Sequence, residues 1–332
     1  MKIGNRRAPF IEYTKPGIFM ITIKKLKDLQ PFSRLVCKSK IPEEIIGVRY
    51  YDLGFIIYHA IKNFKAITPD IEVKQYVIMP DHVHILIQII RPLEHPLGVY
   101  IAIFKRKIFT EATQASIPLK GNRSVFETGF NDQFLRWGRN LNVIYDYIRE
   151  NPMRLWKIKQ DPGYFSRVND RIINGRHCSL YGNLNHLENP FISEVIIHRR
   201  DTLEELSRKK EFWRYVLANG GVLAGAFVSE AEKEIFDGAA RYGGRIILVS
   251  NKAMAKKEKP SKKLFNLCSK GQLLIITPEL PVPISEKGIS RAECLHLNAF
   301  AEELSRMRGG VPSVKTDFRP SADKRRDSDK RE

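Results

Sequence analysis

Residues 76–90 read YVIMPDHVHILIQII and decide the fold of the first part of the chain. Two apolar stretches flank a Pro-Asp dipeptide, which predicts two buried strands joined by a tight turn. His82 and His84 open the second strand, and because side chains alternate between faces, both imidazoles point the same way, about 7 Å apart along the backbone. Two imidazoles on one rigid strand can supply two ligands to one metal ion, although such histidines can also simply cap a strand near its turn.

The composition indicates a folded protein with a polyanionic partner. The 332 residues include 56 Lys and Arg against 37 Asp and Glu, a formal net charge of +19, and 43% are hydrophobic. A basic excess suits nucleic acid, because each neutralised phosphate releases a counterion, but it also fits an ordinary solvated basic surface. We expect a cytoplasmic protein, since the sequence shows no signal peptide, no membrane-spanning apolar run and no CxxC pair among its four cysteines.

Further elements around the opening stretch complete a first domain over residues 1–165. Periodicity predicts a strand over 18–25 and helices over 42–65, 96–114 and 139–150, the last ending where Asn-Pro biases the backbone out of the helical region. Strands linked by a hairpin and covered by helices indicate an α+β fold with a small antiparallel sheet of ferredoxin-like type.

The helix over 139–150 carries polar groups beside its apolar stripe. Tyr147 and Asn151 are four residues apart and therefore share one flank, while Tyr145 falls on the opposite flank. A phenol and a carboxamide directed toward the sheet could supply a nucleophile and a metal-binding oxygen. The same pattern also fits a tyrosine at a core edge and an asparagine that stops a helix.

The remainder of the chain predicts a second domain over 194–306. Short apolar strands over 195–199, 222–227, 245–250 and 272–278 alternate with helices, which indicates a parallel, Rossmann-like α/β layer. Ser229 opens one of these helices as an N-cap. Residues 166–193, rich in Gly, Asn and Pro, are expected to form an extension and linker, and residues 307–332 a disordered charged tail.

Three motifs in the first domain resemble those of the single-tyrosine HUH transposases of insertion sequences, and more closely their domesticated relatives, the REP-associated tyrosine transposases. The motifs are M-P-D-H-V-H at Met79–His84, G-F-N-D at Gly129–Asp132 and Y-I-x-x-N-P at Tyr147–Pro152. The resemblance covers roughly residues 10–165. Asn131 departs from it, because relatives often have histidine there.

This resemblance implies roles for five residues. His82, His84 and Asn151 would bind Mg²⁺ or Mn²⁺, and Tyr147 would attack a phosphodiester of single-stranded DNA next to a palindromic hairpin. Attack would give a 5′-phosphotyrosine and a free 3′-hydroxyl, which conserves the phosphodiester energy for joining. Asp132 would support the site or the DNA.

Basic side chains near the motifs could follow the DNA backbone, or could form an ordinary solvated surface. They are Lys105, Arg106, Lys107, Arg136, Arg139 and Arg149.

The second domain resembles the Rossmann-like domain of DNA-processing protein A and its relatives. The matching segments are Cys268–Pro278 and Arg291–Ala299, although the family has more glycines after its first strand than this chain supplies. The resemblance implies a nucleotide or DNA ligand. The helix that Ser229 opens could receive a phosphate, or the serine could be only a cap.

Three functions therefore remain open: a strand-transfer enzyme, a DNA-binding regulator that has lost cleavage, and a metal-dependent hydrolase without a covalent step. The last should survive replacement of Tyr147 by Phe. The sequence also leaves open whether the protein is a monomer or a homodimer.

Overall fold

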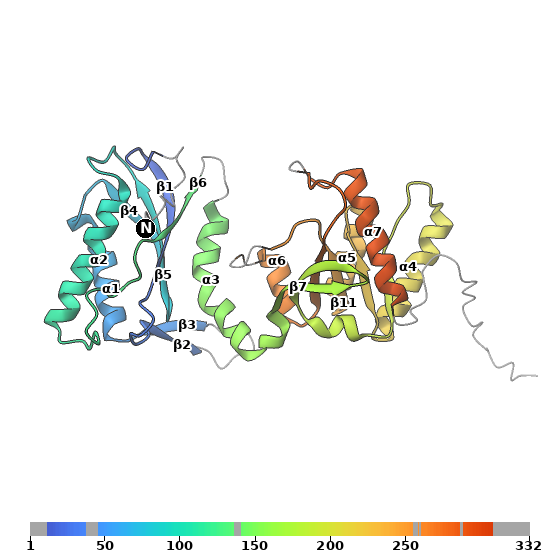
Figure 1. Cartoon of the computed structure of the whole chain (residues 1–332), viewed down its shortest axis with the longest axis horizontal. Helices are drawn as coiled ribbons and strands as arrows, with labels where there is room; N and C mark the ends of the chain where they lie inside the picture. The colour runs from blue at the N-terminus through green and yellow to red at the C-terminus, as the bar shows by residue number, and fades with distance from the viewer. Residues whose placement is uncertain are drawn as a thin grey trace, which may run out of the picture. The chain divides into compact units, whose positions relative to one another are not determined.

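The computed structural model describes residues 12–37, 46–135, 141–254, 258, 260–285 and 288–307 (Figure 1). The chain forms two compact units, the first ending at Lys157 and the second beginning at Ile158. Both units mix helices with sheets that contain antiparallel strand pairs. None of the described helices has the length and apolar character needed to cross a membrane.

A four-stranded antiparallel sheet organises the first unit. Its strands, in spatial order, are β4 (Ile71–Ile78), β5 (His82–Ile89), β1 (Gly17–Lys24) and β6 (Asn131–Leu135). Helices α1 (Asp52–Lys62) and α2 (Leu97–Gln114) lie on one side of the sheet, and α3 (Leu141–Gln160) lies on the other (Figure 1). The hairpin of β4 and β5 confirms the two strands that the sequence predicts around the Pro-Asp turn.

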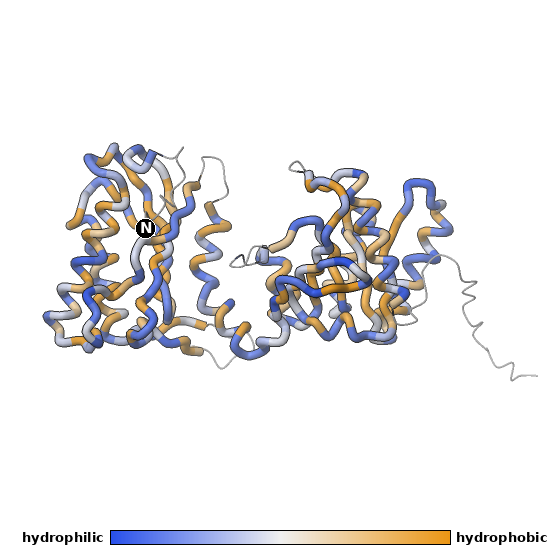
Figure 2. Tube along the Cα trace, viewed as in Figure 1, coloured by the Kyte–Doolittle hydropathy of each residue, from blue (hydrophilic) through white to orange (hydrophobic). Residues whose placement is uncertain are grey.

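Apolar side chains cover both faces of this sheet. Phe19, Ile21 and Ile23 alternate along β1 and are completely buried on the side of α1 and α2. The intervening Met20 packs with Ile148 of α3 on the other side. The strands therefore run as hydrophobic segments through the centre of the unit (Figure 2).

The expected helix over 42–65 is wrong in its first half. Residues Ile46–Tyr50 form β3, which pairs antiparallel with β2 (Ser33–Cys37), and α1 begins only at Asp52. Tyr51 has an extended backbone, and its N–H donates to the carbonyl of Phe32, the residue before β2. Pairing with the preceding strand overrides the local helical spacing here. Residues 42–45 lie outside the described residues.

A six-stranded mixed sheet organises the second unit. Its strands, in spatial order, are β7 (Ser166–Ile173), β8 (Arg176–Gly182), β12 (Leu273–Pro278), β11 (Arg245–Val249), β10 (Val222–Gly225) and β9 (Ile192–Glu194). The last four are parallel to one another, as the sequence predicts, whereas β8 runs antiparallel to β12.

Helices cover the two faces of this sheet. The side chains of α4 (Leu203–Ala218), α5 (Glu230–Arg241) and α6 (Lys262–Ser269) share one apolar core, and those of α7 (Arg291–Arg306) belong to the core of the opposite face. The structure thus has the Rossmann-like alternation of strand and helix from β9 to α7.

Residues 166–193 differ from the expected extension and linker, because they supply β7, β8 and β9 to the sheet. Asn174 and Gly175 join β7 to β8 with positive φ angles of 49° and 77°. Asn-Gly between two strands is the typical sequence of a two-residue hairpin, and the sequence analysis overlooked it. The strand expected over 195–199 lies slightly earlier, at Ile192–Glu194. Of the expected tail, residues 308–332 lie outside the described residues.

Candidate metal and tyrosine site

Strand β5 presents both histidines to the α3 side of the first sheet. Val83 and Ile85 belong to the core beneath α1 and α2, so His82 and His84, which alternate with them, face the other way. Leu86, two residues further on, packs with the residues of α3. Strand alternation therefore gives the shared orientation that the sequence predicts.

Each imidazole is held through its Nδ1 atom. His84 Nδ1 lies 2.8 Å from Thr22 Oγ1 on the neighbouring strand β1, and His82 Nδ1 lies 2.7 Å from Asp81 Oδ1. The two Nε2 atoms lie 3.1 Å apart. A carboxylate on Nδ1 fixes the orientation of a ring, as in histidine metal ligands. The outer partners therefore direct both Nε2 atoms to one point.

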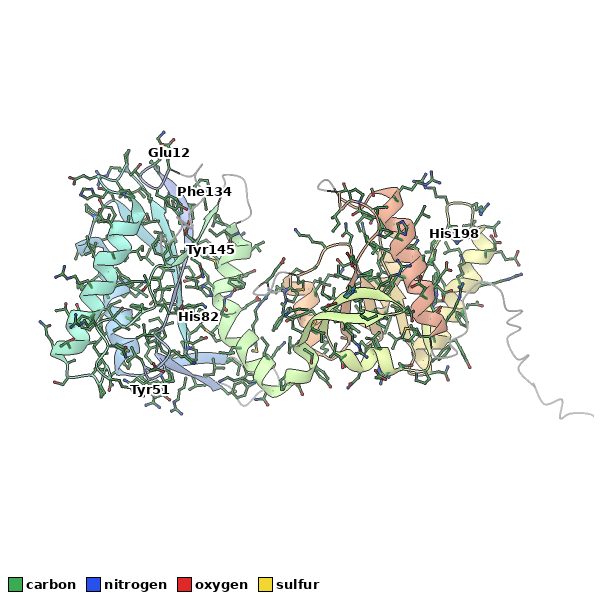
Figure 3. The ribbon with its side chains drawn as sticks, viewed as in Figure 1. Glu12, Tyr51, His82, Phe134, Tyr145 and His198 are labelled. Carbon is green, nitrogen blue, oxygen red and sulfur yellow. The ribbon has the colours of Figure 1, made fainter. Side chains whose placement is uncertain are left out.

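Tyr147 of α3 lies beside this pair. The ring centroids of His84 and Tyr147 are 5.6 Å apart, with an angle of 62° between the rings. Ile148, the next residue, is completely buried and fixes α3 on the sheet. Figure 3 labels His82 and Tyr145, which lie between the sheet and α3. Tyr145 packs into the same apolar cluster as Tyr147, so both tyrosines flank the stripe of α3 that faces the sheet.

Asn151 lies one helical turn after Tyr147 and is 1% exposed. Its Nδ2 donates to the Tyr147 carbonyl at 2.7 Å. A cation would bind the other amide atom, Oδ1, because only the oxygen is a ligand. The expected helix end at this asparagine is wrong, because α3 continues to Gln160 with Pro152 inside it. Leu155 packs against the first sheet, and such tertiary packing offsets the backbone hydrogen bond that the proline lacks.

The donor set fits a divalent cation. Neighbouring ligands of an octahedral ion with bonds of about 2.1 Å lie about 3 Å apart, and the two Nε2 atoms are separated by 3.1 Å. Imidazole and amide ligands suit Mn²⁺, and Mg²⁺ accepts the amide and phosphate oxygens. Within the described ranges no group of three or more His, Cys, Asp or Glu side chains could hold a metal, so a third protein ligand would come from another residue type, such as the amide of Asn151.

Asp132 lies on the opposite side of the sheet from the histidines. It pairs with Ile21, whose side chain points into the core of α1 and α2, and it accepts a hydrogen bond of 2.7 Å from the Tyr13 hydroxyl. A residue on that side cannot contact the imidazole pair. The structure therefore separates Asp132 from the site with which the sequence analysis grouped it.

The basic residues of α2 also lie away from the histidines. The apolar side of α2 packs in the core that covers the other sheet face, and Lys105 donates to the carbonyls of Glu127, at 2.8 Å, and Gly129. Burial lowers the pKa of Lys105 to about 8. Arg106 is exposed, and Lys107 lies 3.9 Å from Glu111.

The remaining arginines have different placements. Arg149 lies on α3, is largely exposed and pairs with Asp146. Arg136 and Arg139 lie outside the described residues.

Three residues near the site were missed by sequence reasoning. Thr22 and Asp81 hold the imidazoles, and the Arg154 guanidinium carbon lies 5.6 Å from the centroid of the Tyr147 ring. Arg154 is buried and follows Tyr147 by seven residues, two helical turns, so helical spacing could have identified it. Thr22 had no such signal, because the register of β1 on β5 brings it to His84.

In the second unit the N-terminus of α5 is capped by side chains of the chain itself. Ser229 Oγ accepts from the Glu232 N–H, and the Glu232 carboxylate accepts from the N–H groups of Ile197, Val228 and Ser229. A carboxylate of the chain itself thus occupies the position where a phosphate would bind a helix N-terminus. Cys268 is buried, and burial raises its pKa to about 12, which excludes an activated thiolate.

Comparisons with known proteins show limited similarity. No family model matches the chain. An uncharacterized protein of Haemophilus influenzae is 22% identical over 176 residues, which cover 46% of this chain and 89% of that protein.

Two solved structures are similar to parts of the chain. One is a REP-associated tyrosine transposase bound to a REP hairpin. The similar region covers 45% of this chain and 74% of the transposase chain, with 19% identity and a TM-score of 0.30. DNA processing protein A from Helicobacter pylori, solved for its single-stranded DNA binding mode, covers 42% and 65%, with 17% identity and a TM-score of 0.30. At these values the comparisons assign neither family nor activity.

Proposed function

We propose that the first unit cleaves single-stranded DNA through a covalent tyrosine intermediate with the help of Mg²⁺ or Mn²⁺. The observation that carries the proposal is the convergence of two imidazole Nε2 atoms, 3.1 Å apart, beside the ring of Tyr147. Structural histidines at a strand end have no need for such an arrangement, because each could bond to a backbone group separately.

Each residue has a distinct part in the proposed reaction. His82, His84 and Asn151 hold the cation, which when bound polarises the scissile phosphate and neutralises developing charge. The Tyr147 Oη attacks phosphorus and releases its proton to solvent. The bond from phosphorus to the 3′ oxygen breaks, that oxygen takes up a proton, and the 5′-phosphate remains on the tyrosine. The reverse attack by a 3′-hydroxyl joins strands without an external energy source.

DNA as the substrate follows from charge and from the motifs. The chain has a net charge of +19, which favours a polyphosphate partner. The M-P-D-H-V-H and Y-I-x-x-N-P motifs occur in the same order as in the transposases that this chain resembles, which act on hairpin-bearing single strands in the cytoplasm. An unpaired strand also leaves the phosphate accessible to a nucleophile fixed on a helix.

The experiment combines the full-length protein, Mn²⁺ and an end-labelled single strand with a hairpin, taken from the DNA flanking the gene. Denaturing gels should show a labelled band at protein mass. The band should be absent with Tyr147→Phe and with EDTA, and should persist with Tyr145→Phe. The last variant is a matched control, because Tyr145 lies on the same helix and packs into the same cluster.

Other outcomes favour the alternatives. Cleavage that persists in Tyr147→Phe would indicate a metal-dependent hydrolase. Binding of the strand without cleavage or a covalent band would indicate a DNA-binding regulator. Either result would contradict the proposed reaction.

A further inference from the structure

A pocket of about 430 Å³ opens on the first unit between α2 and residues 123–130. Its volume lies within the range of about 300–1,000 Å³ that is typical of small-molecule sites. Because α2 covers the sheet face opposite α3, this pocket is separate from the histidine pair. Nothing in the proposed reaction uses it.

Small residues on α2 create the space. Gly98 and Ala102 are one helical turn apart and both line the pocket. A longer side chain at either position would project into the volume, since residues four apart lie on the same side of a helix. Ala102 is exposed, so its small size is not required by the core.

Aromatic rings line the same pocket. Phe109 continues the side of α2 that begins with Gly98 and Ala102, and Phe126 and Phe130 come from the facing segment. Phe126 is 1% exposed and forms the floor of the pocket, whereas Phe109 and Phe130 are partly exposed. Partly exposed rings offer flat apolar surfaces on which an unpaired base can stack.

Positive charge accompanies the rings. Arg106 and Arg123 line the pocket, and neither forms an ion pair with another residue in the described part of the chain. Lys105 fixes the facing segment through its hydrogen bonds to the carbonyls of Glu127 and Gly129. The pocket thus combines a held loop, aromatic walls and two guanidinium groups, which suit a phosphate.

We propose that this pocket binds one unstacked nucleotide of a single-stranded DNA, with the base against the phenylalanine rings and a phosphate at Arg106 and Arg123. That the ligand is single-stranded DNA rests on the proposed function. The pocket lies on the far side of the sheet from Tyr147 and therefore anchors a part of the strand remote from the cleaved bond.

The test uses full-length Tyr147→Phe protein in EDTA, so that binding is measured without cleavage. The probe is a random-sequence single strand that contains 4-thiothymidine. Irradiation should crosslink it to peptides from α2 or residues 123–130. Ala102→Leu, which fills the pocket, should remove this crosslink and weaken binding about tenfold, since stacking of one base contributes about that much.

Thr110→Leu is the control, because it places the same leucine side chain at an exposed position of α2 outside the pocket. Arg106→Gln is a second variant that leaves the space unchanged and should also weaken binding. Absence of the crosslink, or equal binding by Ala102→Leu and Thr110→Leu, would overturn the pocket assignment. A covalent product without the crosslink would overturn this assignment alone, whereas a crosslink without any covalent product in the wild type would overturn the proposed reaction alone.

Discussion

Both units place polar side chains in or beside their sheets, but the hydrogen bonds of these side chains differ. In the second unit Glu232 and Glu293 each accept N–H groups of neighbouring loops, and each completes the cap of a helix. In the first unit the Nε2 atoms of His82 and His84 face each other instead. Carboxylates bonded to the backbone hold a fold together, whereas two Nε2 atoms 3.1 Å apart can share a hydrogen bond or hold a cation together.

The largest effect should follow from His84→Ala, which removes one of the two converging nitrogens. We expect Mn²⁺ affinity and metal-dependent cleavage to fall more than about 100-fold, beyond the range for loss of an outer partner. Titration calorimetry with Mn²⁺ measures the affinity. His177→Ala is the control, since His177 also bonds an aspartate, Asp170, at 2.8 Å but lies on β8 of the second unit. Equal Mn²⁺ binding by the wild type and His84→Ala would remove the metal site.

A smaller loss should follow from Asp81→Asn. The amide keeps the shape of the side chain but no longer supplies a negative charge to His82 Nδ1. We expect Mn²⁺ affinity to fall about 10- to 100-fold, with Asp170→Asn as the matched control. An unchanged affinity would mean that the Asp81–His82 contact does not orient a ligand.

Acid should destabilise the second unit through His186. Burial lowers the pKa of His186 to about 4, and its Nε2 has no hydrogen-bond partner in the described part of the chain. Between pH 6.5 and 4 the unfolded state binds a proton that the folded state does not. The free energy of unfolding therefore decreases as the pH is lowered, by roughly 3 kcal/mol at most.

The check is hydrogen exchange of β12 amides, corrected for intrinsic rates, in the wild type and in His186→Gln. The variant should lose less protection than the wild type over this pH interval. Parallel pH profiles would refute the assignment, whatever the absolute stability of the variant.

The smallest effect should follow from Ser229→Ala. Loss of this cap should destabilise the second unit by about 1 kcal/mol, while DNA cleavage by the first unit stays unchanged. Hydrogen exchange in α5 and the gel assay measure the two quantities. A marked loss of cleavage would show that the α5 cap in the second unit contributes to the reaction.

The sequence predicts the parts of the site that depend on local spacing. Alternation along β5 places His82 and His84 together, and helical spacing places Tyr147 and Asn151 on one flank. Local sequence does not determine on which face Asp132 lies, because a shift of one residue in the register of β6 on β1 would exchange the two faces of β6. The observed register excludes its support of the histidine pair and leaves a role in DNA binding untested.

Larger differences arose where separate segments pair. The strand β3 looks helical by spacing but pairs with β2, and the Asn-Gly hairpin of β7 and β8 joins a sheet whose other strands come later in the chain. The sequence predicts a basic cluster on α2 but not its side of the sheet, and the core packing of α2 places it across the sheet from the histidines.

The most direct test of the central claim is to identify the residue that carries DNA after the reaction. Wild-type protein is incubated with Mn²⁺ and the hairpin-bearing strand, digested with protease and nuclease, and analysed by tandem mass spectrometry. The account predicts a 5′-linked nucleotide on Tyr147 and none on Tyr145. A nucleotide on Tyr145, or cleaved DNA with no modified tyrosine, would contradict it.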